Sequence, residues 1–514
     1  MSRIETTDWT RPLEGLTLDQ VLSWRARVAP EALSVICARG PRLGEANLEM
    51  FEALTRRCAA GLRRLRVDKG DRVALAMDDR IECFAAVYAV WRVGATLVPL
   101  DPRWGGQSLA AILEFAAPKL TLRGETGADL VFPACTRIVE LDELFRAEEE
   151  SFASKSALED LAIVAFTSGT TANPKGVMIP HGNLRKAYRI ARDNLFDTPP
   201  ARFGSVFRIG GLGVLGLNYL FPMECGSASV IMPALTLASV ASLWDDVDRL
   251  RVDFLYLVPT LVQLAARLAK SRPRESILCV TGAAPISREL HAEFQKLFNV
   301  RLKNIYGMTE ASFGIFYGAF DKSGKGAWHL GPQIPGVAAR VRDDADQIVD
   351  GPCEGALEVS GPTLMAGYWK NDAATAAQFR DGWLITGDRV ARDADGNYSI
   401  VGRQKDVVIR GGFNIHLDEV DQTLLAHPKV LSACSVGLAT TTSDEDLGAI
   451  VQVADDFEGQ ASDILSWCRQ RIGAAKTPTR FLLSRTELPR NSHGKLLRAK
   501  VRELLEEQQN WRPR

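Results

Sequence analysis

The sequence has no excess of charge of either sign, no paired cysteine motif and no internal repeat. Its 62 Lys and Arg residues stand against 63 Asp and Glu, so no global field favours a nucleic acid as partner. The nine cysteines stand singly, without a Cys-x-x-Cys spacing. This argues against a disulfide framework or a structural zinc site and predicts a reducing, cytoplasmic compartment. The first residues contain no apolar run, so we expect no secretory signal.

A long uninterrupted apolar run is also missing. The nearest approach is the stretch 209–244, in which Glu224 is the only charged residue. That length would suffice for a membrane span. However, Pro222, Pro233 and several glycines interrupt it. We therefore predict buried core, part of it lining a ligand pocket, and no membrane span.

Short apolar runs alternate with longer amphipathic stretches along the first 300 residues. A chain of 514 residues suggests about three structural units, at roughly 150 residues per domain. Strands are predicted over 73–77, 96–100, 254–258 and 277–281, and helices over 81–92, 260–269 and 287–298. Such alternation predicts an α/β fold with mostly parallel sheets covered by helices.

The composition of the sequence changes near Gly331. Gly, Pro and short predicted strands dominate up to Gly402, which indicates a small β-rich unit. A helix is predicted over 417–425, strands over 431–436 and 449–453, and a basic helix over 495–507. We therefore predict a large N-terminal domain, 1–402, with its β-rich part over about 331–402, and a small C-terminal α/β domain, 403–514.

One loop has the composition of a phosphate-binding segment. The apolar run 161–166 is followed directly by TSGTTANPKGV at 167–177, which is rich in Gly, Ser and Thr and carries one lysine. Backbone N–H groups, hydroxyls and an ammonium can together surround phosphate oxygens. The loop is not a Walker A motif, because Pro174 replaces its second glycine and Gly176 replaces its Ser/Thr. A P-loop NTPase or kinase is therefore disfavoured, and the loop alone leaves an ordinary surface loop as the alternative.

The loop resembles the signature loop of the adenylate-forming superfamily, which contains acyl-CoA synthetases, luciferases and adenylation domains. It departs from that family's T-S-G-T-T-G-x-P-K-G only at Ala172. Five further stretches resemble the family's motifs in order and spacing. They are TGAAP at 281–285, NIYGMTE at 304–310, WLITGD at 383–388, GRQKDVVIRGGFNI at 402–415 and PRNSHGKLLR at 489–498. The likeness extends over nearly the whole chain and is to acyl-CoA ligases.

The resemblance implies an enzyme with a two-step reaction. ATP activates a carboxylic acid to an acyl-adenylate with release of pyrophosphate, and the acyl group then passes to the thiol of CoA. The implied cofactors are ATP, Mg²⁺ and CoA, or a carrier-protein phosphopantetheine in place of CoA. The implied partners are a small-molecule carboxylic acid and, in the second case, a carrier protein.

The resemblance also assigns roles to individual residues. Lys495 bridges the acid and the α-phosphate, Thr309 bonds the α-phosphate, and Glu310 holds Mg²⁺ together with Thr170. Lys175 neutralises the β- and γ-phosphates, while Asp388 and Arg403 grip the ribose. The complete set of expected nucleotide-binding residues is Thr167, Ser168, Gly169, Thr170, Thr171, Lys175, Gly282, Ala283, Ala284, Pro285, Asn304, Ile305, Tyr306, Gly307, Met308, Thr309, Asp388, Arg403 and Lys495.

The resemblance further implies that the small domain is mobile. Lys405 corresponds to the family's hinge position, about which the small domain rotates between the two steps. The rotation would bring the loop Gly411, Gly412 and Phe413 to the site. Paired glycines let the backbone approach a thin pantetheine arm, although an ordinary glycine turn is the alternative.

The acid is the least defined part of the hypothesis. In SVFRIGGLGVLG at 205–216, Arg208 stands where the family usually has His or another aromatic residue, and where amino-acid-activating members often have Asp. An arginine would repel an ammonium, so an α-amino acid is disfavoured. Its fork suits a second anionic or carbonyl group of a dicarboxylic, keto or polar aryl acid; alternatively, Arg208 faces solvent or a phosphate. The expected pocket residues are Arg208, Gly211, Leu212, Thr281, Gly282, Gly307 and Met308.

Two other hypotheses remain open. A stand-alone adenylation enzyme would load a carrier-protein phosphopantetheine instead of CoA. A non-catalytic protein would bind AMP or an acyl-adenylate, but the presence of Lys495, Glu310 and Thr309 argues against it, because a binder has no need of a bridging lysine.

Overall fold

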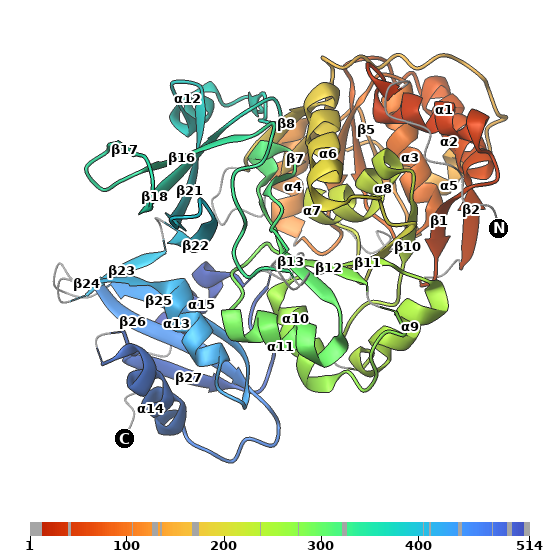
Figure 1. Cartoon of the computed structure of the whole chain (residues 1–514). Coiled ribbons are helices and arrows are strands. Elements are labelled where there is room, and N and C mark those ends of the chain that lie inside the picture. The colour runs from red at the N-terminus through yellow and green to blue at the C-terminus, as the bar shows by residue number, and fades with distance from the viewer. Residues whose placement is uncertain are drawn as a thin grey trace.

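Figure 1 shows the computed structural model, in which two large helix-covered sheets are followed by a β-rich unit and a small α/β unit. Its coordinates describe residues 13–39, 43–104, 106–125, 132–133, 136–166, 174–236, 238–275, 277–320, 326–403, 406–410, 413–439, 445–474, 476–490 and 496–507.

The first large sheet contains the strands nearest the predicted phosphate loop. Its order is β19 (Gly367–Tyr368), β8 (Gly176–Pro180), β7 (Leu161–Phe166), β4 (Thr96–Leu100), β3 (Arg72–Ala76), β5 (Leu120–Arg123) and β6 (Ile138–Glu140). The strands from β7 to β6 are parallel, whereas β8 and β19 are antiparallel to their neighbours. The strands predicted at 73–77 and 96–100 are thereby confirmed.

Helices cover both faces of this sheet, which explains its continuous apolar strands. Val73 and Leu75 pack into a cluster with α3 (Ile81–Arg92), while Ala74 packs into another cluster with α4 (Gly106–Ala116). The helix predicted at 81–92 has these same bounds. The other helices of this region are α1 (Leu18–Val28), α2 (Leu48–Arg64), α5 (Leu141–Leu144) and α6 (His181–Leu195).

The second large sheet places six parallel strands side by side. Its order is β13 (Arg301–Asn304), β12 (Leu278–Thr281), β11 (Phe254–Leu257), β9 (Arg202–Ser205), β10 (Ala228–Ile231), β1 (Leu33–Cys37) and the antiparallel edge strand β2 (Gly44–Asn47). Helices α9 (Leu243–Leu250), α10 (Pro259–Leu268) and α11 (Arg288–Phe298) pack on one face. The predicted strands and helices of this region agree to within one residue at each end.

The apolar stretch 209–244 is mostly buried core, as predicted. It forms α7 (Leu212–Leu215), the π-helix η3 (Gly216–Leu220), α8 (Phe221–Cys225), β10, the short 3₁₀ helix η4 (Val240–Ser242) and the start of α9. Within the described ranges, no helix combines the length and the apolar character that crossing a bilayer requires.

The β-rich unit is an antiparallel sheet with one helix that the sequence did not predict. Its elements are β16 (Ala338–Arg342), β17 (Ile348–Val349), β18 (Cys353–Ser360), α12 (Asp372–Gln378), β20 (Phe379–Arg380), β21 (Trp383–Arg392) and β22 (Tyr398–Arg403). The strands β18 and β21 are longer than the short strands expected.

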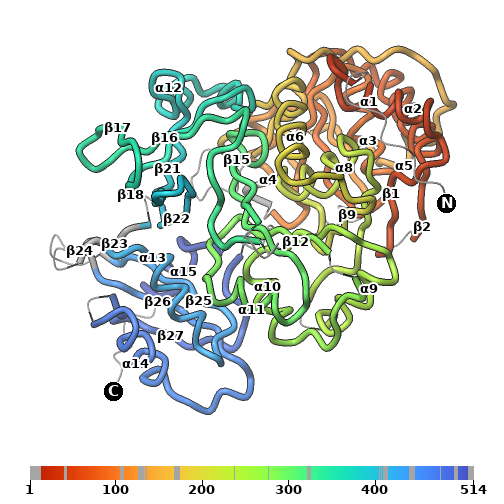
Figure 2. The backbone as a smooth tube through the Cα atoms, in the orientation of Figure 1, coloured from red at the N-terminus to blue at the C-terminus, as the bar shows by residue number. Residues whose placement is uncertain are grey.

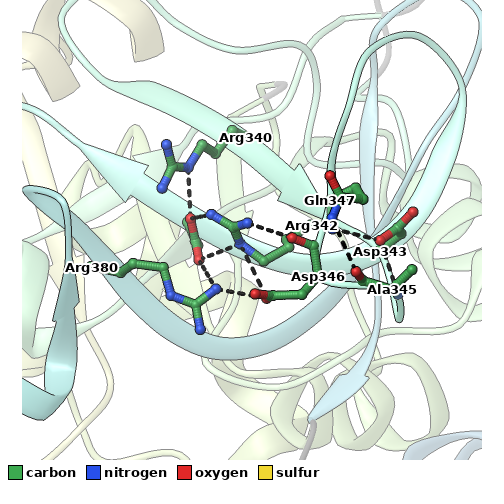
Figure 3. Close-up of polar contacts among 8 residues, drawn as sticks. Arg340, Arg342, Asp343, Ala345, Asp346, Gln347 and Arg380 are labelled. Carbon is green, nitrogen blue, oxygen red and sulfur yellow. Dashed lines mark hydrogen bonds and ion pairs between the residues drawn. The ribbon is translucent and has the colours of Figure 1, made fainter.

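One face of this sheet carries a cluster of charged side chains (Figure 3). Glu358 is 2% exposed, and it accepts from Arg340 Nε at 2.6 Å and Arg342 Nε at 3.1 Å. The nearest nitrogen of Arg380 lies 3.7 Å from its carboxylate. Burial would raise the pKa of Glu358, but the arginines outweigh it and lower that pKa. The cluster therefore holds a charged carboxylate and stabilises the sheet on this face.

The C-terminal segment is the blue part of the backbone trace in Figure 2. Its buried side chains form hydrophobic cores of their own. Its elements are β23 (Val407–Arg410), β24 (Phe413–His416), α13 (Leu417–Leu425), β25 (Val430–Ala439), β26 (Glu445–Val453), α14 (Ala461–Ile472), β27 (Arg480–Ser484) and α15 (Arg498–Glu507). The helix at 417–425 agrees with the prediction, and the basic helix begins three residues later than predicted. The sequence did not predict α14 and β27.

One arginine of the second sheet's helices contacts the C-terminal segment. Arg267 on α10 donates to the backbone oxygens of Leu425, His427 and Val430, at the turn between α13 and β25. Gln263 on the same helix donates to the oxygen of Leu425 at 3.2 Å. Both donors therefore bind main-chain oxygens.

Candidate active site

The predicted motifs gather where parallel strands end. The carboxyl ends of β9, β12 and β13 share one edge of the second sheet, and the segments 206–211, 282–285 and 305–310 leave from that edge. Ligands of open α/β sheets bind outside the carboxyl ends of the strands. The strand order thus brings three of the predicted motifs together.

The loop predicted to contact adenine is exposed and fixed in shape. Ala283 has a φ of +67°, and Ala283 and Ala284 are exposed. A Cβ at Gly282 would lie 2.5 Å from the backbone oxygen of Ile305. Glycine is therefore required where this loop passes the one that follows β13. Thr281, which precedes the loop, is fully buried, whereas Pro285 is half-buried.

The YGMTE motif forms the neighbouring segment. Tyr306 and Gly307 form β14 (Tyr306–Gly307), which pairs with β15 (Gly314–Phe316), and a Cβ at Gly307 would overlap the oxygen of Phe313. Thr309 and Glu310 lie on the 3₁₀ turn η5 (Thr309–Ala311) and are half-buried. Three further residues of this segment are half-buried: Asn304, Ile305 and Met308.

Tyr306, Asp388 and Arg403 form a hydrogen-bonded group. Tyr306 Oη donates to Asp388 Oδ2 at 2.5 Å, and Arg403 Nε lies 3.0 Å from Asp388 Oδ1. Asp388 and Arg403 face each other across β21 and β22. Burial and the charge of Asp388 raise the pKa of Tyr306, so its phenol stays a donor. Each carboxylate oxygen has two lone pairs, so Asp388 can accept two further hydroxyl protons.

Tyr368 is a residue that the sequence reasoning missed. Its Oη lies 2.9 Å from Glu310 Oε1, and its ring centroid lies 5.0 Å from Lys175 Nζ. Glu310 and Lys175, which the sequence assigned to metal and phosphate, therefore share one aromatic neighbour. The only sequence signal was an aromatic residue after Gly367, and nothing in it pointed to Glu310, which is 58 positions away.

The Glu310 carboxylate can serve as a ligand of Mg²⁺. This ion needs one or two protein oxygens and keeps several waters. The half-buried Glu310 offers a carboxylate of which one oxygen is bonded to Tyr368. In the part of the chain that the structure describes, three or more His, Cys, Asp or Glu side chains nowhere gather as a metal site. A carboxylate oxygen is the kind of ligand that Mg²⁺ prefers.

The backbone around Arg208 is held from both sides. Arg39 and Asp79 form a paired contact at 2.9 and 3.0 Å. Arg39 also donates to the oxygen of Phe207, and Asp79 accepts from the N–H of Ile209 at 3.1 Å. The Arg208 side chain itself is exposed, and no hydrogen bond or ion pair joins it to another described residue. The first sheet's loop at Asp79 thus fixes the backbone from which the exposed Arg208 side chain extends.

Among the other predicted pocket residues, Gly211 and Leu212 follow Arg208 closely. Both are buried at the start of α7. A Cβ at Gly210 would overlap the carboxylate of Asp101, which is fully buried and paired with Arg103 at 2.9 Å. The first sheet's loop after β4 therefore restricts this segment too.

Several predicted residues lie outside the described residues, so their roles stay predictions. They are Thr167, Ser168, Gly169, Thr170, Thr171, Lys405, Gly411, Gly412 and Lys495. Of Phe413 only the backbone is described.

Two family models match the sequence over most of its length. The AMP-binding enzyme model matches residues 23–369, and the AMP-binding enzyme C-terminal domain model matches residues 419–495. The chain belongs to the AMP-binding enzyme family. Tyr306, Glu310 and Tyr368 lie within the first match, and the second ends at Lys495.

Relatives of this AMP-binding enzyme include acid–CoA ligases. It is 30% identical over 504 residues to a feruloyl-CoA synthase of Amycolatopsis sp, which covers 93% of this chain and 98% of that protein. It is 28% identical over 512 residues to the 2-succinylbenzoate–CoA ligase of Geobacillus kaustophilus, covering 95% and 98%. The solved o-succinylbenzoate coenzyme A synthetase of Bacillus subtilis, in complex with ATP and magnesium ion, has a TM-score of 0.81 at 25% identity and covers 94% of this chain and 98% of that one. The α/β fold expected from the sequence is confirmed.

Proposed function

We propose that this protein is an AMP-forming acid–CoA ligase. The observation that carries the proposal is the Asp388 carboxylate, which Tyr306 and Arg403 fix beside the predicted adenine loop and which keeps lone pairs for two ribose hydroxyls. The near full-length similarity to CoA ligases supports CoA, rather than a carrier protein, as the thiol. It also supports catalysis over mere nucleotide binding.

In the first step an oxygen of the acid's carboxylate attacks the α-phosphorus of ATP. A P–O bond forms there, the bond to the β-phosphate oxygen breaks, and pyrophosphate leaves. Two anions must approach each other, so fixed positive charge has to offset their repulsion. Lys495 would bridge them, Thr309 would bond the α-phosphate, and the exposed Lys175 would face the β- and γ-phosphates. Glu310, with Thr170, would hold Mg²⁺, which supplies charge neutralisation to the phosphates when bound.

In the second step the CoA thiolate attacks the acyl carbonyl carbon. A C–S bond forms, the C–O bond to AMP breaks, and the pair of electrons leaves on the AMP phosphate. The small C-terminal unit, 403–514, would rotate about Lys405 between the steps. Gly411, Gly412 and Phe413 would then line the thiol channel, where backbone without bulky side chains suits a thin pantetheine arm.

We propose that the acid carries a second polar group, which Arg208 binds. Arg208 is exposed and without an ion-pair partner among the described residues, while the peptides on both sides of it are fixed by Arg39 and Asp79. Its guanidinium can bind a carboxylate or carbonyl through two parallel N–H donors. The acids named for two relatives, feruloyl and 2-succinylbenzoate, also bear polar groups beyond the reacting carboxyl.

The test is acid-dependent ATP–pyrophosphate exchange without any thiol, over fatty, aryl, dicarboxylic, keto and amino acids. Exchange with one class would show adenylation and identify the acid. Adding CoA or a phosphopantetheinyl carrier protein then separates the two thiols. Arg208→Ala should raise KM for the acid at least 10-fold, with KM for ATP unchanged. The control is Arg274→Ala, whose side chain is 88% exposed. Exchange with no acid, together with AMP binding that Lys495→Ala leaves unchanged, would contradict catalysis and favour a nucleotide-binding protein.

A further inference from the structure

We propose that Tyr368 is a positioning residue for the ATP site, which holds the Glu310 carboxylate with its hydroxyl and the Lys175 ammonium with its ring before ATP binds. The inference rests on the roles proposed for Glu310 and Lys175. It adds a residue outside the motifs that the sequence singled out.

The backbone fixes Tyr368 beside the strand that follows Lys175. β19 pairs with β8, so that Tyr368 faces Val177, and the N–H of Trp369 donates to the oxygen of Gly176 at 2.7 Å. The N–H of Tyr368 donates to Thr375 Oγ1 at 2.9 Å. Its side chain is 2% exposed. The phenol therefore has little freedom to turn away from the site.

The same segment also holds the main chain of Glu310. The N–H of Met365 donates to the oxygen of Glu310 at 2.8 Å, and the N–H of Ala366 donates to the oxygen of Met178 at 2.9 Å. Residues 365–369 thus connect the metal-binding segment to β8. Tyr368 completes this connection through side chains.

The hydroxyl of Tyr368 has two acceptors within reach. Glu310 Oε1 lies at 2.9 Å and Gln378 Oε1 at 3.0 Å. A phenol has one proton, so it donates to one of them at a time. The amide nitrogen of Gln378 donates to the oxygen of Ile385, which keeps the amide oxygen facing Tyr368. Gln378 thereby offers a second acceptor, so the buried hydroxyl is not left without a hydrogen bond.

The phenol stays a donor across the physiological pH range. A tyrosine hydroxyl ordinarily gives up its proton only at a pH of about 10. A neutral hydroxyl orients the carboxylate without adding a competing anion beside the phosphates. A glutamate or aspartate at position 368 would repel both the Glu310 carboxylate and the phosphates.

The ring of Tyr368 holds Lys175 by a weaker contact. Lys175 Nζ lies 5.0 Å from the ring centroid, within the range of a cation–π interaction, and the lysine is exposed. Contacts of this kind at exposed sites are weak, whereas hydrogen bonds to phosphate are charge-assisted and stronger. The ring thus holds the ammonium before ATP binds and releases it to the phosphates.

The experiment measures ATP affinity by calorimetry, with Mg²⁺ and with EDTA, for the full chain and for Tyr368→Phe, Tyr368→Leu and Glu310→Gln. Tyr368→Phe keeps the ring, so Mg²⁺-dependent affinity should fall about 10-fold while metal-free affinity is unchanged. Tyr368→Leu should also weaken metal-free binding about threefold, and Lys175→Ala should weaken it by at least as much. The control is Tyr398→Phe, another buried tyrosine, whose hydroxyl accepts from Arg392 at 3.4 Å. It should match the unmodified protein.

The experiment distinguishes a wrong role for Tyr368 from a wrong role for Glu310. If Glu310→Gln reduces the effect of Mg²⁺ and Tyr368→Phe does not, the positioning role of Tyr368 is overturned while the proposed role of Glu310 holds. If neither variant changes the effect of Mg²⁺ on ATP affinity, the role proposed for Glu310 is wrong, and the inference about Tyr368 is wrong as well. A parallel loss of metal-free and Mg²⁺-dependent affinity in Tyr368→Phe would indicate a merely structural residue and also overturn the proposal.

Discussion

Replacing Asp388 by asparagine should selectively remove recognition of the ribose hydroxyls. Asp388 is 5% exposed, and Tyr306 and Arg403 fix its two oxygens. Two hydroxyls that donate to this carboxylate contribute about 1.5 kcal/mol each, since hydrogen bonds to charged groups are the stronger kind. Together they amount to about 3 kcal/mol, which sets an upper limit of roughly 100-fold on the loss of AMP affinity in Asp388→Asn, since the amide keeps one acceptor oxygen. The fold should survive, because the unpaired Arg403 side chain is 48% exposed.

Calorimetry with AMP, 2′-deoxy-AMP and 3′-deoxy-AMP tests this reasoning. On the unmodified protein each deletion should cost about 10-fold in affinity. On Asp388→Asn each should cost clearly less, because an uncharged amide with one acceptor oxygen replaces the two charged oxygens of the carboxylate. Asp393→Asn is the matched control, at the exposed turn of the same hairpin. Equal losses for both deoxynucleotides on the variant and the unmodified protein would refute the proposed ribose contact.

Three further predictions concern other parts of the molecule. Burial lowers the pKa of Lys303 to about 8 from 10.5, so between these pH values the folded state binds fewer protons than the unfolded chain. The free energy of unfolding should therefore rise as the pH increases from about 8 to 10.5. Urea titrations of Lys303→Met should lack that rise. Gly210→Ala places a methyl against the Asp101 carboxylate, and kinetics should show a higher KM for the acid with KM for ATP unchanged; equal changes in both would contradict a local effect. Arg267→Ala removes hydrogen bonds to three backbone oxygens, and hydrogen exchange should become faster at 425–430 while residues 72–76 keep their protection.

The sequence predicted elements well where one local pattern decided them. Helices 81–92 and 417–425 have the predicted bounds, because their apolar spacing and flanking residues leave little choice of start and end. The helix α14 was missed because its apolar stripe is narrow: of its residues, only Ile464 and Cys468 are buried. The π-helix at 216–220 was not foreseeable either, since it arises from packing among continuous apolar residues.

The site was predictable as a set of motifs but not as a set of contacts. Tyr306 and Asp388 were both named, yet they are 82 positions apart, and their hydrogen bond follows from the way β14 and β21 meet. Tyr368 was absent from the prediction because only the pairing of β19 with β8 brings it to Glu310 and Lys175. The hydrogen bond that fixes the backbone beside Arg208 joins Arg39 to the oxygen of Phe207, 168 positions away. Periodicity describes each segment and does not record which distant segments touch.

The contact made by Arg267 has a consequence for comparing related sequences. Its guanidinium binds backbone oxygens at 425, 427 and 430, which every amino acid provides. The side chains at those three positions can therefore drift without loss of the bond, provided the turn keeps its shape. Two homologues can share this contact with no residue in common at the turn, and a search for correlated substitutions would find no covariation between them. Only the arginine would be conserved, and the residues that it contacts could be identified only from a structure.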